Sequence, residues 1–184
     1  MRNLNQNSKK HLRKGEKLEE IMIAKKMVDA LNAQINKELN SAYIYLGMVD
    51  YFVSENYDGM ASWMKAQAHE ELEHAEKLIN FVQERSGKVD YPAIEKVTNK
   101  YKSPLAAFKA GLEHEKFISA SIHELYELAL AEKDYGTQEM LRWFISEQVE
   151  EESNFENVIG RLEMVADAPG GLMIMDGKLG YRKE

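Results

Sequence analysis

A repeat of apolar residues every three or four positions, in four long segments, is the feature that most constrains how this chain folds. Such spacing puts the apolar side chains on one face of an α-helix, so each segment predicts a helix with one buried face. Each face is interrupted at its middle by polar residues that include a carboxylate. The four predicted faces are Leu31, Ile35, Glu38, Ala42, Tyr45 and Val49; Met64, Gln67, Glu71, His74, Leu78 and Phe81; Phe108, Leu112, Glu115, Ile118, Ile122 and Leu125; and Leu141, Phe144, Gln148, Glu151, Phe155, Val158 and Leu162.

Residues that start and stop helices delimit these segments. Ser103 followed by Pro104 predicts the start of the third helix, and Gly87 predicts the end of the second. The sequence Pro169-Gly170-Gly171 predicts the end of the fourth helix. We therefore expect helices over residues 16–52, 59–85, 104–132 and 137–165, and a short final helix over 172–179.

The lengths of the connections predict the topology. Residues 54–58 and 133–136 are short connections, so the helices that each joins form an antiparallel hairpin. The middle connection, residues 86–102, spans about 50 Å at roughly 3.3 Å per residue, enough to run back along a helix of about 40 Å. The prediction is an all-α, four-helix bundle of up-down-down-up order, with one long crossover and a short C-terminal fifth helix.

Length and composition suit a single domain. The chain has 184 residues, 44% of them hydrophobic, and no cysteine, which excludes disulfides and thiolate metal ligands. Residues 1–17 carry six basic residues and one acidic residue, a formal charge of +5, so the rest of the chain carries −12. We expect a basic tail over residues 1–17, which is either a disordered arm or sequence upstream of a true start, and one domain over residues 18–184.

Charge and hydropathy also bear on partners and location. The acidic body argues against nucleic-acid binding, because a nucleic acid requires a basic surface. The tail lacks the apolar core of a secretory signal, and no segment is apolar enough to span a membrane. We therefore expect a cytoplasmic protein with no nucleic-acid or membrane partner.

The carboxylates on the buried faces are Glu38, Glu71, Glu115 and Glu151. A buried, ionised carboxylate is costly unless a cation or metal compensates it, and no Lys or Arg stands on these faces. Their four charges would be balanced by two divalent cations. For any one glutamate, a solvated or ion-paired position is the simpler interpretation; for the four together, a metal site is favoured.

The types of ligand indicate the metal. Glu71 and His74 are three residues apart, so a carboxylate and an imidazole are neighbours on one helical face. Oxygen-rich ligation with one imidazole favours Fe²⁺ or Mn²⁺, although Zn²⁺ can compete. Glu71 is the candidate bridge between two metals about 3.5–4 Å apart, both of which can then donate an electron to one O₂. Gln148 is either a weak ligand or a hydrogen-bond donor beside the ligands.

Four segments of the sequence are similar to known proteins. Residues 31–45 (LNAQINKELNSAYIY), 63–74 (WMKAQAHEELEH), 114–115 and 143–152 (WFISEQVEEE), in this order, resemble the ferritins of the non-haem bacterial and archaeal type. The resemblance extends over residues 21–179 and implies a ferritin-like bundle that oxidises Fe²⁺ with O₂ or peroxide. It further implies that Fe³⁺ is stored as a hydrated oxide mineral in a homo-oligomeric shell of twenty-four subunits.

The resemblance also implies which residues bind iron. Tyr45 is then an electron donor or hydrogen-bond partner beside the centre, although a core aromatic is an equally simple interpretation. His69, His114 and His123 lie off the buried faces, so we expect them at the surface or next to the ligands. The implied ligands are Glu38, Glu71 and His74 at one iron; Glu71, Glu115 and Glu151 at the other, with Gln148 alongside; and Glu70, Glu147 and Glu150 at a third iron position. Position alone predicts that these last three form a solvated acidic face.

Two departures distinguish this chain from the bacterioferritins, which it also resembles. Bacterioferritins carry a second E-x-x-H on the fourth helix, where this chain has Gln148-x-x-Glu151, so the expected centre is asymmetric. They also carry a haem-binding methionine directly after the bridging glutamate, where this chain has Leu72, so we expect no haem. A di-iron oxygenase or peroxidase for an organic substrate, and a structural helical bundle, are the alternative functions.

Overall fold

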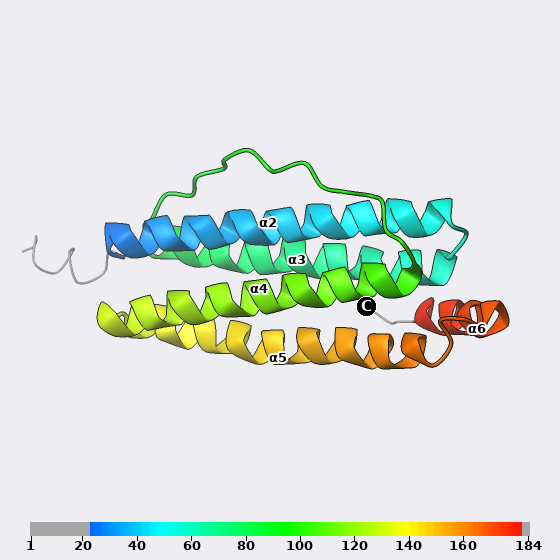
Figure 1. Ribbon diagram of the computed structural model, residues 1–184. Coiled ribbons are helices and arrows are strands. Elements are labelled where there is room, and N and C mark those ends of the chain that lie inside the picture. The colour runs from blue at the N-terminus through cyan, green and yellow to red at the C-terminus, as the bar shows by residue number, and fades with distance from the viewer. Residues whose placement is uncertain (1–22, 182–184) are drawn as a thin grey trace, which may run out of the picture.

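Five helices and the connections between them make up the computed structural model, which describes residues 23–181 (Figure 1). The helices are α2 (Lys25–Ser54), α3 (Asp58–Glu84), α4 (Pro104–Ala131), α5 (Tyr135–Glu163) and α6 (Pro169–Leu179). The predicted all-α bundle with a short fifth helix is confirmed, and the bounds of α3, α4 and α5 differ from the predicted ones by at most two residues. The expected tail, residues 1–17, and the expected helix start at residue 16 lie outside the described residues. The first predicted helix is too long at its start, however, because residues 23–24 are not helical and α2 begins at Lys25.

The direction of the helices follows the predicted up-down-down-up order (Figure 1). Helices α2 and α3 form one antiparallel hairpin and α4 and α5 the other, while α6 lies at the end of the bundle near the start of α3. Between the hairpins, residues 85–103 run the length of α2 as an extended crossover. None of the described helices is long and apolar enough to cross a lipid bilayer.

The crossover is attached to α2 at several points. Near its start, the Asn32 amide donates to the Lys88 carbonyl at 2.9 Å and accepts from the Asp90 backbone N–H at 3.0 Å. Further along, Gly47 allows the closest approach, because a Cβ atom there would lie 2.4 Å from the carbonyl oxygen of Thr98. These contacts hold a connection that has no regular secondary structure of its own.

The helix ends differ from the prediction at two places. Ser103 caps α4 as expected, accepting from the Ala106 N–H at 3.1 Å. At the end of α3, however, Ser86 rather than Gly87 adopts the left-handed conformation, with φ of 59°. Pro169 also does not end α5; it is at the start of α6, where its missing N–H is tolerated.

The bundle interior consists of two apolar clusters with a polar layer between them. One cluster lies at the end of the bundle near α6 and includes Phe52, Trp63 and Phe155; the other lies at the opposite end and includes Leu31 and Phe144. Each fully buried large side chain contributes about 1.5–3 kcal/mol to folding. On the predicted faces, every residue is buried except for the half-buried Val49, Phe81 and Leu112. The apolar clusters therefore hold the polar residues of the middle layer in a region closed to solvent.

Candidate metal centre

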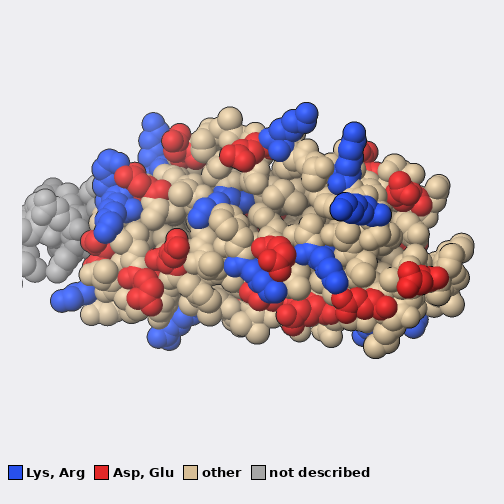
Figure 2. All heavy atoms as spheres, in the orientation of Figure 1, with Lys and Arg blue, Asp and Glu red and all other residues tan. Residues whose placement is uncertain are grey.

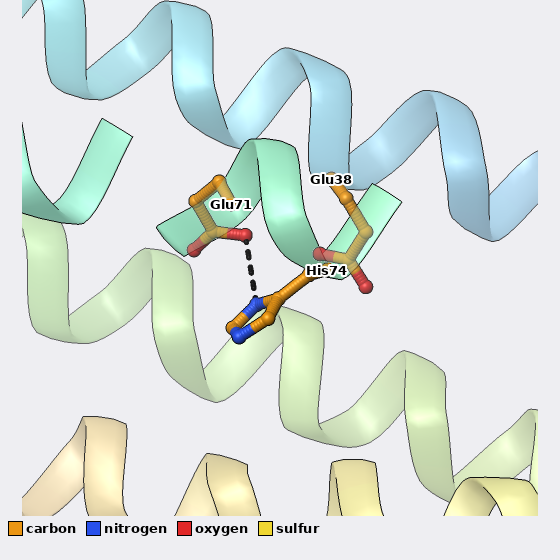
Figure 3. Close-up of side chains that lie close together, drawn as sticks. All are labelled: Glu38, Glu71 and His74. Carbon is orange, nitrogen blue, oxygen red and sulfur yellow. Dashed lines mark ion pairs between the residues drawn. The ribbon is translucent and has the colours of Figure 1, made fainter. Parts of the chain in front are cut away.

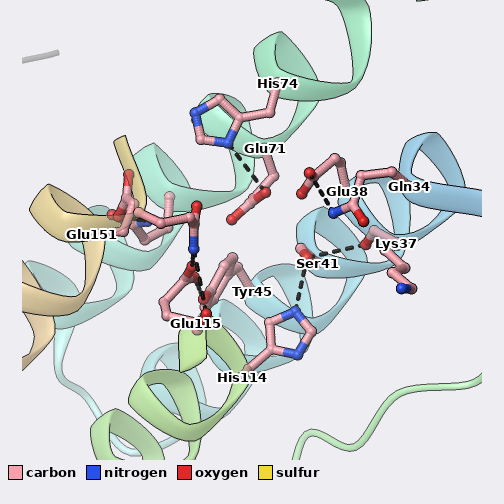
Figure 4. A network of polar contacts seen from close by, with 12 residues as sticks. Gln34, Lys37, Glu38, Ser41, Tyr45, Glu71, His74, His114, Glu115 and Glu151 are labelled. Atoms are coloured by element: carbon pink, nitrogen blue, oxygen red, sulfur yellow. Dashed lines mark hydrogen bonds and ion pairs between the residues drawn. The ribbon is translucent and has the colours of Figure 1, made fainter. Parts of the chain in front are cut away.

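The polar layer brings the predicted carboxylates and histidine together halfway along the bundle (Figure 4). Each comes from the buried face of its helix: Glu38 from α2, Glu71 and His74 from α3, Glu115 from α4 and Glu151 from α5. None of the five has more than 4% of its surface exposed. The local reason is periodicity, because these positions continue the same apolar stripes that build the two clusters.

Glu38, Glu71 and His74 form one group of potential metal ligands (Figure 3). Ligand atoms of the three side chains all lie within 4.8 Å of one another. His74 Nδ1 is 3.4 Å from Glu71 Oε2, as expected for residues one helical turn apart. Oε2 of Glu38 and Oε2 of Glu71 are buried and accept no hydrogen bond from any described residue. Because a carboxylate oxygen without a partner is costly to bury, these atoms fit a bound cation.

A second group places His74 beside the fourth long helix. Ligand atoms of His74, Glu147 and Glu151 also lie within 4.8 Å of one another. The resemblance assigned Glu147 to a third iron position with Glu70 and Glu150. In the structure Glu147 is half-buried and reaches the edge of the main centre, while burial and the charges of Glu150 and Glu70 raise its pKa. Glu147 thus lies between the main centre and the two other acidic residues.

Glu115 and Glu151 already have hydrogen-bond donors. Tyr45 donates its hydroxyl to Glu115 Oε1, and Gln148 donates its amide to Glu115 Oε2 at 3.0 Å. Gln67 donates to Glu151 Oε2 at 2.7 Å. Of the roles left open by the sequence, Gln148 and Tyr45 therefore act as hydrogen-bond donors to a carboxylate in this structure.

The pKa values of the buried groups also bear on cation binding. Burial, opposed in part by a hydrogen bond from Gln34, raises the pKa of Glu38 to about 7. Burial and the charges of Glu115 and Glu38 raise the pKa of Glu71 well above its usual range. Burial lowers the pKa of His74 to about 4, so its imidazole is neutral at pH 7 and keeps a lone pair for a metal. Without a cation the carboxylates are therefore partly protonated, and a metal binds in competition with protons.

Several polar residues around the centre were not assigned a role from the sequence. Gln34 donates to Glu38 at 2.9 Å from one turn earlier on α2, and this four-residue spacing is a signal that could have revealed it. Gln67 lay on a predicted face without an assigned role. No sequence signal connects Ser41 with His114, whose side chains lie 2.7 Å apart.

The other described histidines lie where the sequence predicted, at the surface or next to the ligands. His69 and His123 are exposed. His114 is half-buried beside the ring of Tyr45, and burial lowers the pKa of His114 to about 4. His114 therefore lies next to the centre rather than at the surface. His11 is outside the described residues.

Comparisons with known proteins agree with this geometry. Residues 28–165 match the ferritin-like domain family. The bacterial non-heme ferritin of Campylobacter jejuni is 37% identical over 155 residues, covering 84% of this chain and 93% of that protein. The bacterial non-heme ferritin of Bacteroides fragilis is 37% identical over 161 residues, covering 88% and 100%. A novel open pore ferritin from the hyperthermophilic archaeon Archaeoglobus fulgidus superposes with a TM-score of 0.87 at 43% identity, covering 88% and 99%.

A buried carboxylate and histidine site inside a four-helix bundle with a long crossover defines the class of ferritin-like proteins. This chain belongs to the ferritin family, and within it to the non-haem bacterial and archaeal type, as the sequence predicted. Membership in this family supports a role in iron storage.

Proposed function

We propose that this protein is an iron-storage ferritin with ferroxidase activity. It oxidises Fe²⁺ with O₂ or peroxide at a buried di-iron centre and stores the Fe³⁺ as a hydrated oxide mineral inside a homo-oligomeric shell. The observation that supports the proposal is that Oε2 of Glu38 and Oε2 of Glu71 are buried and accept no hydrogen bond of ordinary geometry from the described residues, beside the neutral imidazole of His74. These three side chains offer a divalent cation two oxygens and a nitrogen, the ligand types that Fe²⁺ accepts.

The substrate would bind as two Fe²⁺ ions. Glu38, Glu71 and His74 hold one, and Glu71, Glu115 and Glu151 hold the other, with Gln148 and Tyr45 donating hydrogen bonds to Glu115. Together the four carboxylates neutralise both ions. Each Fe²⁺ gives one electron, and O₂ accepts two electrons and two protons to become hydrogen peroxide. Protons displaced from the carboxyl groups of Glu38 and Glu71 when iron binds are available for this step, because burial keeps these groups partly protonated beforehand.

Oxidised iron needs a route out of the buried centre. Glu147 lies within 4.8 Å of His74 and Glu151 at the ligand atoms and is half-buried, so it is the next carboxylate that an ion meets. Glu70 and Glu150 add negative charge close to Glu147. These three residues form the proposed third iron position, through which ions pass between the centre and the mineral.

Further parts of the proposal follow from family membership. The shell has twenty-four subunits, the protein is cytoplasmic, residues 18–184 form the ferritin-like di-iron domain, and no haem is bound. Acidic and basic side chains are mixed on the face shown in Figure 2, with acidic residues gathered over α5 and no broad basic surface. This face offers no support for nucleic-acid binding.

The first test is aerobic oxidation of Fe²⁺ supplied at two ions per chain, with size-exclusion chromatography to follow the iron. We expect rapid oxidation and iron retained in a large particle. Glu71→Gln should abolish rapid oxidation, because it removes the bridging carboxylate. Glu73→Gln, on the exposed face of the same helix, is the matched control and should oxidise iron normally. Unchanged oxidation in Glu71→Gln would reject the centre, and a small oligomer that keeps only two irons would favour an oxygenase.

A further inference from the structure

A series of hydrogen bonds connects the protein surface to the buried ligand Glu38. Lys37 on α2 donates to the hydroxyl of Ser121 on α4. Ser121 donates to the amide oxygen of Gln34 at 2.5 Å. The amide nitrogen of Gln34 then donates to Oε1 of Glu38 at 2.9 Å, as Figure 4 shows for the last step.

The direction of these bonds is set at the lysine. An ammonium group only donates, so Ser121 must accept from Lys37 and direct its own hydrogen to another acceptor. The amide oxygen of Gln34 is that acceptor. As a result the NH₂ group of Gln34 faces Glu38, and the opposite orientation of the amide would set two oxygens against each other. Lys37 and Ser121 therefore determine which end of the Gln34 amide meets the carboxylate.

The consequence appears at the two oxygens of Glu38. Oε1 is occupied by Gln34, whereas Oε2 is buried and accepts no hydrogen bond from the described part of the chain. Ligand atoms of Glu71 and His74 lie within 4.8 Å of that of Glu38. The series thus leaves one oxygen of Glu38 available in the group that fits a cation.

The outer end of the series is open. Lys37, Ser121 and Gln34 line a surface groove of about 260 Å³ between α2 and α4. Lys37 is half-buried there, with its ammonium 5.4 Å from the ring centroid of Phe117. A lysine that is only partly solvated can hold its hydrogen bond to Ser121 without the full cost of burying a charge.

We infer that Gln34, oriented by Ser121 and Lys37, is a positioning residue that fixes the carboxylate of Glu38 so that Oε2 is presented to the metal. This inference rests on the proposed function, since it assumes that Glu38, Glu71 and His74 bind a cation. Partners that orient a ligand typically change metal affinity by about 10–100-fold when they are removed. Neither Ser121 nor Lys37 donates a hydrogen bond to Glu38. Ser121 therefore acts through Gln34, whereas Lys37 acts both through Ser121 and Gln34 and through its positive charge, which lowers the pKa of Glu38.

The test variants interrupt this series of hydrogen bonds at residues that make no hydrogen bond to Glu38. Ser121→Ala removes the hydroxyl, and Lys37→Met removes the ammonium while keeping a long apolar side chain. Ser121→Thr keeps a hydroxyl at this position and is the conservative variant. Lys116→Met, an exposed lysine on α4, is the control. Circular dichroism melting of the metal-free proteins shows that each variant folds.

The measurement is titration of the metal-free protein with Co²⁺, following its visible absorption, alongside Fe²⁺ oxidation kinetics. We expect Ser121→Ala to raise the Kd for Co²⁺ about tenfold and to alter the absorption band. Lys37→Met should alter the band as well but raise the Kd less, because removing a positive charge near Glu38 itself favours cation binding. The KM for Fe²⁺ should rise more than kcat falls, while Ser121→Thr and Lys116→Met behave as the unmodified protein. Unchanged Co²⁺ affinity and absorption in both Ser121→Ala and Lys37→Met would overturn the inference.

Glu38→Gln separates this inference from the proposed function. If Glu38→Gln weakens Co²⁺ binding but the Ser121 and Lys37 variants do not, the metal site stands and only the positioning role is rejected. If Glu38→Gln leaves Co²⁺ binding unchanged, Glu38 is not a ligand, and both the proposed centre and the positioning role are rejected.

Discussion

Replacing Glu38 by glutamine should stabilise the metal-free protein while removing its capacity to bind metal. Glu38 is fully buried, and burial raises its pKa from the usual 4.5 to about 7. Each pKa unit corresponds to about 1.36 kcal/mol, so ionised Glu38 costs the folded state about 3 kcal/mol. Glutamine has nearly the same shape without the charge, and it can still accept a hydrogen bond from Gln34 through its amide oxygen.

The sign of the pH dependence follows from the raised pKa. Below about pH 4 the carboxyl group is protonated in both the folded and the unfolded chain, so Glu38→Gln should change stability little. Between about pH 4.5 and 7 the unfolded chain ionises first, and the folded wild-type protein loses stability relative to the variant. Above about pH 7 the difference reaches its full size, about 3 kcal/mol or roughly 6–12 °C in melting temperature for a chain of this length.

Differential scanning calorimetry in the presence of a chelator measures this difference from pH 4 to pH 8. Glu73→Gln is the control, because its exposed carboxylate should change stability by no more than about 0.5 kcal/mol. With Zn²⁺ added, the order should reverse, since the wild-type protein gains binding energy that the variant cannot. The reasoning is refuted if Glu38→Gln melts below the wild-type protein at pH 8 without metal.

Three further predictions concern the metal, the crossover and a helix end. Zn²⁺ at 100 times its Kd should raise the free energy of unfolding of the wild-type protein by about 2.7 kcal/mol. A melting temperature that does not change when Zn²⁺ is added would contradict a native metal site. Gly47→Ala should lower the free energy of unfolding by about 1–3 kcal/mol, because the new Cβ would clash with the Thr98 carbonyl oxygen. Gly160→Ala, which has free space around it, should be neutral or stabilising. Equal denaturant midpoints for the two variants would contradict the packing argument. Lys133→Gly should raise the free energy of unfolding by up to about 1 kcal/mol, because φ is 55° at this position, a conformation that glycine adopts without strain. Lys133→Ala should give no such gain. Thermal melting distinguishes the two variants, and a gain in stability with alanine would contradict the backbone explanation.

Local sequence patterns determined most of the fold. A spacing of three or four residues depends only on helix geometry, so the four buried faces and their polar centres could be derived before any contact was known. The connection lengths then determined the topology, because residues 86–102 can span a helix whereas the other two connections cannot. Helix ends were less certain, as Ser86 and Pro169 show, because several residue types can take the last or first position of a helix.

Only the tertiary structure decided how individual atoms meet in the polar layer. The sequence placed Glu38, Glu71 and His74 on two helices. Which carboxylate oxygens lack a hydrogen bond depends on the relative shift and rotation of those helices. The same holds for Glu147, whose contact with His74 joins residues far apart in the chain. Ser121 carries no sequence signal at all, since its bond to Gln34 spans 87 positions. Periodicity is a property of one helix, whereas a hydrogen bond between helices exists only once the bundle is packed.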